Sequence, residues 1–116
     1  NHQEVRGEDR LFVRSAEELL AEKTRAILTR SKGRDYFDFW YMLSKGISLR
    51  ADYIREKMKW HGKDYRQEDL TEIIAAAKEK DLYNDLARFL PKHYRQTVRD
   101  LKKNILQKLG ASGIEA

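Results

Sequence analysis

The stretch EELLAEKTRAILTRSKGRDYFDFWYML, residues 17–43, decides the fold, because it contains two helical patterns on either side of a short basic turn. Apolar residues recur at three- and four-residue spacing both before and after SKG. Within that turn, Gly33 is available for the positive φ that the exit from a helix often needs. The stretch therefore predicts two consecutive helices, over residues 16–30 and 34–45, that meet at a tight corner.

The sequence on both sides of this pair predicts further helices. Ser15 followed by Glu18 matches a capping box, which sets the start of the first helix at residue 16. The later helices are predicted over residues 49–61, 67–80, 81–90 and 92–109. Because the chain has only one Pro and six Gly and few β-branched residues, we expect an all-α fold, a compact bundle of five to six helices.

The two ends are expected to differ from the bundle. LFVR, residues 11–14, could be a short extended piece, so residues 1–14 are predicted to be an extended segment or linker. Residues 110–116 are predicted to be a flexible tail. No linker divides the chain, and residues 1–116 are predicted to form a single helical domain.

The composition limits the possible functions of the chain. It has no Cys, which excludes a disulfide framework and thiolate metal sites, and it contains no apolar run long enough for a membrane span. We expect a cytoplasmic location and no membrane partner. The net charge of +5, with 37% charged residues, favours a polyanionic partner, although interleaved charges of both signs are equally typical of a solvated helical surface.

The corner between the first two predicted helices collects charges beside apolar residues. Lys23 and Arg30 fall within the apolar stripe of the first helix, where an idle charge is costly. Asp35 and Asp38 are three residues apart, on one face of the second helix, within reach of Lys23, Arg30 or Arg34. Two interpretations remain open. Either these groups form salt bridges that only stabilise the corner, or they present fixed cations to a phosphate chain, with a carboxylate that orients the cations or helps to hold a metal.

Two other groups of side chains allow both a structural and a functional interpretation. The aromatic run YFDFWYML, residues 36–43, could stack on a base, but is more simply a buried helix on which Tyr53, Trp60 and Leu49 pack. The last helix carries a basic sector that is either a phosphate-tracking face for RNA or a plain solvated face. Its residues are Arg95, Arg99, Lys102 and Lys103. The three His are isolated, so no metal site is predicted.

The corner also carries a recognisable motif. Residues 17–43 resemble the second half of the AbiEii/AbiGii toxin family of nucleotidyltransferases, in which a Lys-x-x-Ala-x-x-x-Arg helix precedes a basic turn and Arg-Asp-x-x-Asp. The six matching positions are Lys23, Ala26, Arg30, Arg34, Asp35 and Asp38. The resemblance covers about a quarter of the chain directly, and the helices after Gly46 fit the family only in general style.

This resemblance implies an activity and roles for residues. Members of the family transfer a nucleotide from an NTP, with Mg²⁺, to an acceptor that is tRNA in certain cases, and some are paired with a cognate antitoxin. By the resemblance, Lys23 would bind nucleotide phosphates and act in catalysis with Asp35. Arg30 and Arg34 would also bind phosphates, and Asp38 would support them. Fixed positive charge suits the departing pyrophosphate.

The resemblance also implies that part of the enzyme is missing. The family's Gly-Ser turn followed by paired acidic metal ligands is absent from this sequence, which opens with Asn in a polar run. We therefore expect the chain to be the carboxy-terminal helical part of such an enzyme, inactive alone and without bound cofactor. The alternative is a non-enzymatic helical module that binds nucleic acid or is covered by an antitoxin.

Overall fold

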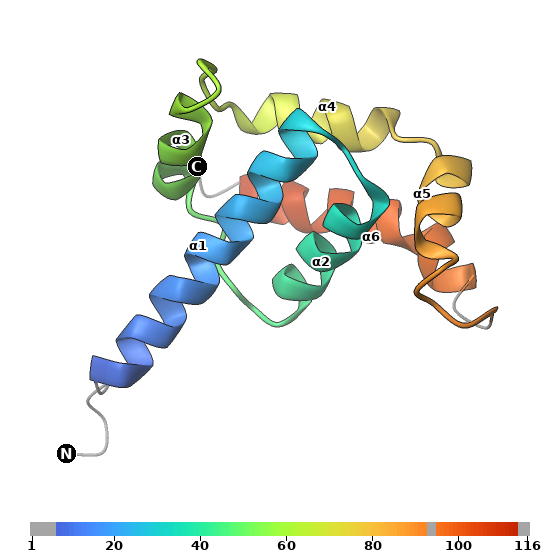
Figure 1. The fold of residues 1–116 in the computed structure, drawn as a ribbon, viewed down its shortest axis with the longest axis horizontal. Coiled ribbons are helices and arrows are strands. Elements are labelled where there is room, and N and C mark those ends of the chain that lie inside the picture. The colour runs from blue at the N-terminus through green and yellow to red at the C-terminus, as the bar shows by residue number, and fades with distance from the viewer. Residues whose placement is uncertain (1–6, 93–94, 114–116) are drawn as a thin grey trace.

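The computed structural model describes residues 7–92 and 95–113, and six α-helices account for most of them (Figure 1). The helices are α1 (Gly7–Thr29), α2 (Gly33–Ser44), α3 (Ala51–Lys59), α4 (Gln67–Ala76), α5 (Glu79–Leu86) and α6 (Arg95–Gly113). The described residues include no strand. The expected all-α bundle is confirmed.

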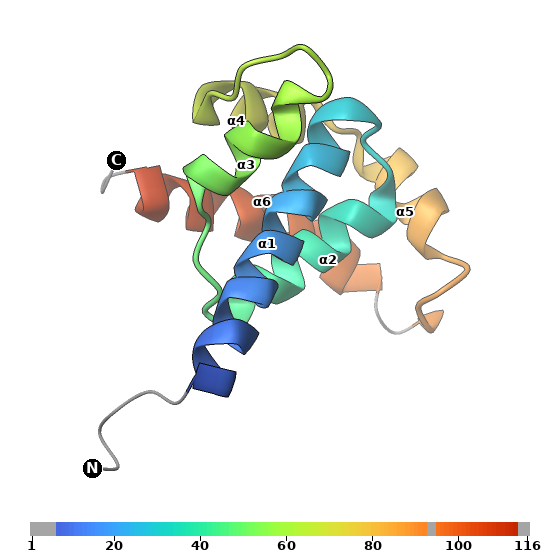
Figure 2. The same ribbon diagram turned by 60° about the vertical axis from the view of Figure 1, so that its left-hand side comes forward.

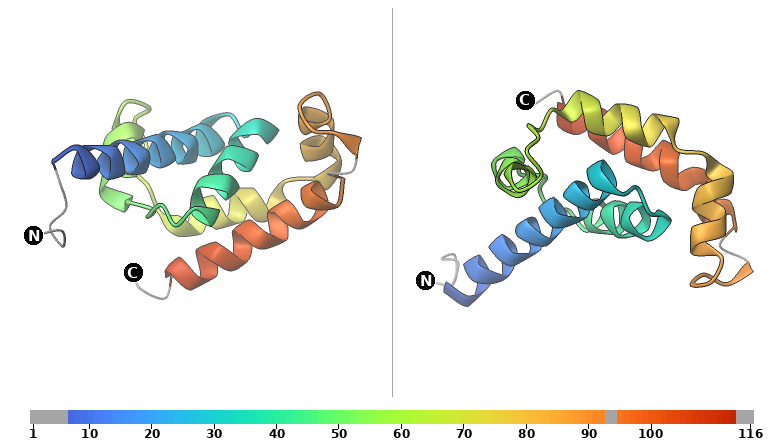
Figure 3. Two further views of the ribbon diagram at one scale, coloured as in Figure 1. Left: turned by 90° about the horizontal axis from the view of Figure 1, so that it is seen from below. Right: turned by 45° about the horizontal axis from the view of Figure 1, so that its top comes forward.

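Two long helices organise the bundle. α1 packs against α2, α3 and α4, and α6 packs against α2, α4 and α5. Figure 2 shows α2 between α1 and α6, while α4 and α6 run side by side in the right-hand view of Figure 3. α2, the helix that follows the basic turn, contacts α1, α5 and α6, so both long helices pack against it.

The core is formed by one apolar face from each helix. α2 contributes Tyr36 and Phe39, which are almost completely buried, as the aromatic run led us to expect. Each remaining helix adds at least two buried apolar side chains. They are Leu20 and Ile27 of α1, Ile54 and Met58 of α3, Leu70 and Ile74 of α4, Leu82 and Leu86 of α5, and Val98, Leu101, Ile105 and Leu109 of α6.

The amino-terminal end of the bundle differs from the prediction. Residues 11–14 are not extended, because α1 begins at Gly7, and its first turns project away from the other helices (Figures 1 and 2). Ser15 lies inside α1 and therefore cannot be an N-cap. Glu18 instead pairs with Arg14, one turn earlier, at 3.2 Å. A local capping pattern was thus misread where a helix already runs through it.

The carboxy-terminal end also differs from the prediction. α6 continues to Gly113, so residues 110–113 are helical rather than part of a flexible tail. Gly110 faces open space, and nothing around it obstructs the helix. The rest of the predicted tail, residues 114–116, lies outside the described residues, as do residues 1–6.

The tight corner between α1 and α2 depends on a different residue from the one expected. Ser31 has the left-handed backbone conformation, with φ of 54°, and its hydroxyl donates to the Ile27 carbonyl at 2.6 Å. Gly33 is instead the first residue of α2 and is buried. The glycines that do have positive φ are Gly46 and Gly62, after α2 and α3.

Candidate functional site

The α1–α2 corner brings the sequence-predicted cations and carboxylates together in pairs. Lys23 Nζ of α1 lies 3.0 Å from Asp38 Oδ2 of α2. The Lys23 side chain is 27% exposed and that of Asp38 is 39% exposed, so this pair lies at the edge of the core, in contact with solvent. An ion pair at such a position can be opened by a competing anion, because water and counter-ions reach both groups.

The second pair is more tightly held. Arg30 Nε donates to Asp35 Oδ2 at 2.9 Å, and Arg30 Nη2 donates to Asp35 Oδ1 at 3.0 Å, which is a bidentate arrangement. Asp35 is only 3% exposed, whereas the Arg30 side chain is 56% exposed. The hydrogen bond to the Asp35 carboxylate, followed by the charge of that carboxylate, raises the pKa of Arg30 above its usual value. A buried carboxylate thus fixes a solvent-facing guanidinium.

Arg34, the third cation of the motif, is held by an aromatic ring. Its guanidinium carbon lies 4.6 Å from the centroid of the Phe89 ring, within the range of a cation–π contact. The i, i+4 spacing of Arg34 and Asp38 allowed a pair between them, but Asp38 pairs with Lys23. Arg34 and Phe89 are both exposed.

A contact from a distant helix holds the corner in place. The backbone N–H of Gly33 donates to Asp85 Oδ2 of α5 at 2.8 Å. The N-cap residue, Lys32, makes no side-chain cap hydrogen bond, so Asp85 caps α2 across space. Sequence reasoning found neither Asp85 nor Phe89. The only signal was Gly33 itself, which was attributed to a turn conformation.

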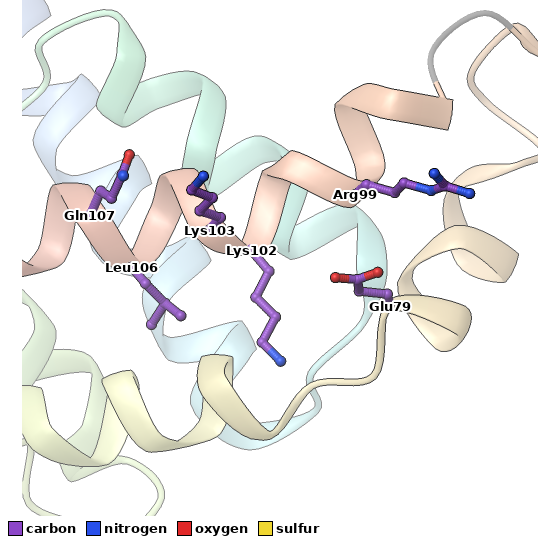
Figure 4. Close-up of a pocket in the computed structure, with 6 residues that line it drawn as sticks. All are labelled: Glu79, Arg99, Lys102, Lys103, Leu106 and Gln107. Atoms are coloured by element: carbon purple, nitrogen blue, oxygen red, sulfur yellow. The ribbon is translucent and has the colours of Figure 1, made fainter.

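The basic residues of α6 do not form one continuous face. Lys102 Nζ donates to the Ala77 carbonyl at the end of α4, at 2.9 Å. Arg99 and Lys103 are exposed. In Figure 4 the Lys102, Lys103 and Arg99 side chains diverge from α6 around a groove of about 470 Å³, which Glu79 also lines. Arg95 begins α6, but its side chain lies outside the described part.

The carboxylates of the corner do not form a metal site. Within residues 7–92 and 95–113, no three His, Cys, Asp or Glu side chains come together in a way that could hold a metal ion. Asp35 and Asp38 each face a cation instead. Both oxygens of Asp35 accept hydrogen bonds from Arg30, whereas Asp38 faces Lys23 with one oxygen.

A comparison with known protein families now adds to this geometry. The model of the nucleotidyl transferase AbiEii toxin family, of type IV toxin–antitoxin systems, matches residues 4–107. The chain belongs to the AbiEii toxin family. The match confirms the resemblance seen in residues 17–43 and extends it over helices that fitted only in general style. No curated protein and no solved structure is significantly similar to the chain.

Membership of this family makes the chain part of a group of nucleotidyltransferase toxins. Every residue of the corner lies within the matched range, as do Asp85 and Phe89, which contact it from the α5 region. Among the described helices, none combines the length and the apolar character needed to cross a lipid bilayer.

Proposed function

We propose that the chain is the helical part of an AbiEii nucleotidyltransferase toxin and that its α1–α2 corner binds the phosphate chain of a nucleoside triphosphate. Lys23, Arg30 and Arg34 bind the phosphates, and Asp35 and Asp38 orient two of these cations. The observation that carries the proposal is the bidentate contact between exposed Arg30 and buried Asp35.

Arg30 keeps the capacity to bind an anion while it is paired. A guanidinium has five N–H donors, and the contact with Asp35 uses two of them. The other three are available to solvent or to a ligand on the exposed side of the group. A purely stabilising salt bridge does not require a half-exposed Arg, whereas a pre-oriented phosphate-binding Arg does.

Lys23 binds phosphate when a phosphate oxygen takes the place of its partner, Asp38. Its ammonium is a compact point charge with three donors, and Asp38 occupies only part of its surroundings. A phosphate oxygen can join or replace Asp38 at the edge of the core. The role of Asp38 is then to keep the Lys23 side chain extended towards the corner before the nucleotide arrives.

Asp35 acts in catalysis through Arg30 rather than by contact with a metal. Mg²⁺ in nucleotidyl transfer neutralises charge on the phosphates. The described residues contain no group of three His, Cys, Asp or Glu side chains that could hold that ion, so its ligands come from elsewhere in the enzyme. The chain alone therefore binds nucleotide but transfers none. In the complete toxin, which acts in the cytoplasm, the acceptor is tRNA and an antitoxin is the protein partner.

Calorimetric titration of the 116-residue chain with each NTP tests the proposal. Contacts to phosphate alone predict similar affinity for all four nucleotides. Lys23→Met and Arg30→Met should each weaken binding by about tenfold, the loss expected for one charge-assisted contact. Lys59→Met is the matched control, because Lys59 is an exposed cation at the end of α3 that pairs with Glu56 of its own helix and with neither corner carboxylate. Unchanged affinity in both corner variants would refute the proposal.

A second function rests on the exposed cations of α6. Arg99 and Lys103 flank the groove in Figure 4 and could contact RNA phosphates without any nucleotide transfer. In that case Arg99→Ala and Lys103→Ala should each weaken RNA binding and lower the salt dependence by about one phosphate contact. Corner variants should then have no effect on RNA binding, which separates this function from the first.

A further inference from the structure

The segment that follows α5 reaches the corner at two points. Asp85 accepts the hydrogen bond from the Gly33 N–H, and four residues later the Phe89 ring lies under the Arg34 guanidinium. Gly33 and Arg34 are consecutive residues at the start of α2. One short segment, residues 85–89, therefore holds both the backbone and a cationic side chain of the corner.

The Asp85 contact changes how an anion can bind at this helix end. A helix N-terminus binds anions through backbone N–H groups that have no partner within the helix. Here the first such N–H already donates to a carboxylate at 2.8 Å. The amino-terminal end of α2 is thus partly neutralised, and a phosphate at the corner must depend more on side-chain cations.

Arg34 is an exposed cation whose position depends on Phe89. The Phe89 ring forms a cation–π contact with the Arg34 guanidinium, and within the described part of the chain no carboxylate pairs with that group, since Asp38 pairs with Lys23 and Asp35 with Arg30. A free Arg side chain samples many rotamers and loses that freedom when it binds a ligand. The stack restricts the side chain beforehand, while the N–H groups at the edge of the guanidinium stay available.

We propose that Phe89 is a positioning residue that holds Arg34 ready to bind the phosphate chain. This inference rests on the proposed function of the corner and adds a residue that lies far from the motif in sequence. Phe89 does not touch the nucleotide. It acts through Arg34, and its own ring is 55% exposed, so packing in the core does not explain its place.

A double-mutant cycle on the 116-residue chain tests this role, with sodium tripolyphosphate as the probe in calorimetric titrations. Phe89→Ala should weaken binding about three- to tenfold, the range of an exposed to partly desolvated cation–π contact. Phe89→Tyr, which keeps the ring, should bind as the wild type does. In the Arg34→Ala background, Phe89→Ala should have no further effect.

A control variant separates the stack from a general effect of aromatic truncation. Tyr41, at the other end of α2, is also exposed. The centroid of its ring lies 5.2 Å from Lys45 Nζ. Tyr41→Ala should leave tripolyphosphate affinity unchanged. Because Phe89 is exposed, Phe89→Ala should fold with a nearly unchanged thermal midpoint, so that a loss of affinity cannot be attributed to unfolding.

The possible results distinguish the two proposals. If Lys23→Met and Arg30→Met weaken binding but Phe89→Ala does not, the positioning role is wrong and the proposed function stands. If Phe89→Ala weakens binding equally with and without Arg34, Phe89 contacts the ligand itself and the positioning role is again wrong. If none of the corner variants changes affinity, the proposed function fails, and this inference fails with it.

Discussion

Gly33 and Asp85 are 52 residues apart in the sequence, yet the Gly33 N–H donates to the Asp85 carboxylate at 2.8 Å. The approach is so close that a Cβ on Gly33 would lie 2.5 Å from Asp85 Cβ and 3.1 Å from Oδ2. Gly33 is therefore required by the packing of α2 against α5, and its φ is not the reason. The same contact fixes the first turn of the helix that carries Arg34 and Asp35.

We predict that Gly33→Ala destabilises the protein, because the added methyl must push α5 away from α2. The expected loss is about 1–3 kcal/mol, typical of overpacking at a rigid contact. Gly110→Ala is the control, since nothing lies within 4 Å of the added Cβ and the residue is helical. It should be neutral or stabilise by up to about 1 kcal/mol. Urea unfolding measures both variants.

A Gly33→Ala variant as stable as the wild type would show that the corner can relax. The inference that packing requires a glycine at this position would then be wrong. If Gly110→Ala were equally destabilising, the effect at Gly33 could not be assigned to Asp85. Nucleotide affinity should fall in Gly33→Ala, because Arg34 and Asp35 move with the first turn of α2. It should stay unchanged in Gly110→Ala.

The Arg30–Asp35 contact predicts an asymmetric response to mutation. Asp35→Asn removes the charge but keeps one acceptor, so it should cost about 1–2 kcal/mol of stability. Arg30→Met should cost more, because it leaves the 3% exposed carboxylate of Asp35 without its partner. The double variant should be less destabilised than the sum of the two single variants. Urea unfolding of the wild type, the two single variants and the double variant gives the coupling free energy between Arg30 and Asp35.

Equal effects of the two single variants, with strict additivity, would contradict a coupled pair at the corner. Nucleotide titration adds a second measurement on the same proteins. Asp35→Asn should weaken binding less than Arg30→Met, since the guanidinium remains and loses only its orientation. Stronger weakening in Asp35→Asn would instead indicate that the carboxylate itself contacts the ligand or its metal.

The sequence was informative where contacts are local. Asp35 and Asp38 reach cations of α1 across a turn of a few residues, so helical spacing was enough to predict that they would meet. The buried stripe of the last helix, which includes Val98, Leu101 and Ile105, also follows directly from the three- and four-residue spacing of its apolar residues. Fold class and most of the candidate site were accessible from such local patterns.

The sequence was less informative where the environment decides between local alternatives. The Ser15 capping pattern is a valid helix start, but in the structure a helix already runs through it from Gly7. Trp60 was expected to pack on the aromatic run and is 89% exposed instead, because it follows the last turn of α3. The contacts of Asp85 and Phe89 depend on where α5 docks, which no local pattern records.

We predict that the two neighbouring lysines of α6 differ in function. Lys102 donates to the Ala77 carbonyl at the C-cap of α4, so Lys102→Met should cost about 1 kcal/mol through the lost hydrogen bond. Lys103 is exposed, and Lys103→Met should be neutral in urea unfolding. If RNA binds to α6, Lys103→Met should weaken RNA binding more than Lys102→Met does. The reverse order would contradict the structural role of Lys102.

Tyr65 provides a prediction for alkaline pH. Its side chain is 4% exposed, and its hydroxyl has no hydrogen-bond partner in the described part of the chain. Burial raises the pKa of Tyr65 to about 12, and the nearby charge of Arg55 opposes this shift. Above the ordinary tyrosine pKa of about 10, the unfolded chain loses this proton while the folded chain keeps it, so stability should fall as the pH rises from about 10 to about 12.

Tyr65→Phe should remove this contribution and leave the fold intact. At neutral pH the variant should be as stable as the wild type or more stable by up to about 1 kcal/mol, because an unpaired buried hydroxyl is costly. Between pH 10 and 12, Tyr65 should account for a fall on the order of 2 kcal/mol that the variant does not show. Urea unfolding at a series of pH values measures the difference. Parallel pH profiles for the two proteins would show that the pKa of Tyr65 is not raised, and a clear loss of stability in Tyr65→Phe at pH 7 would show that the hydroxyl has a partner.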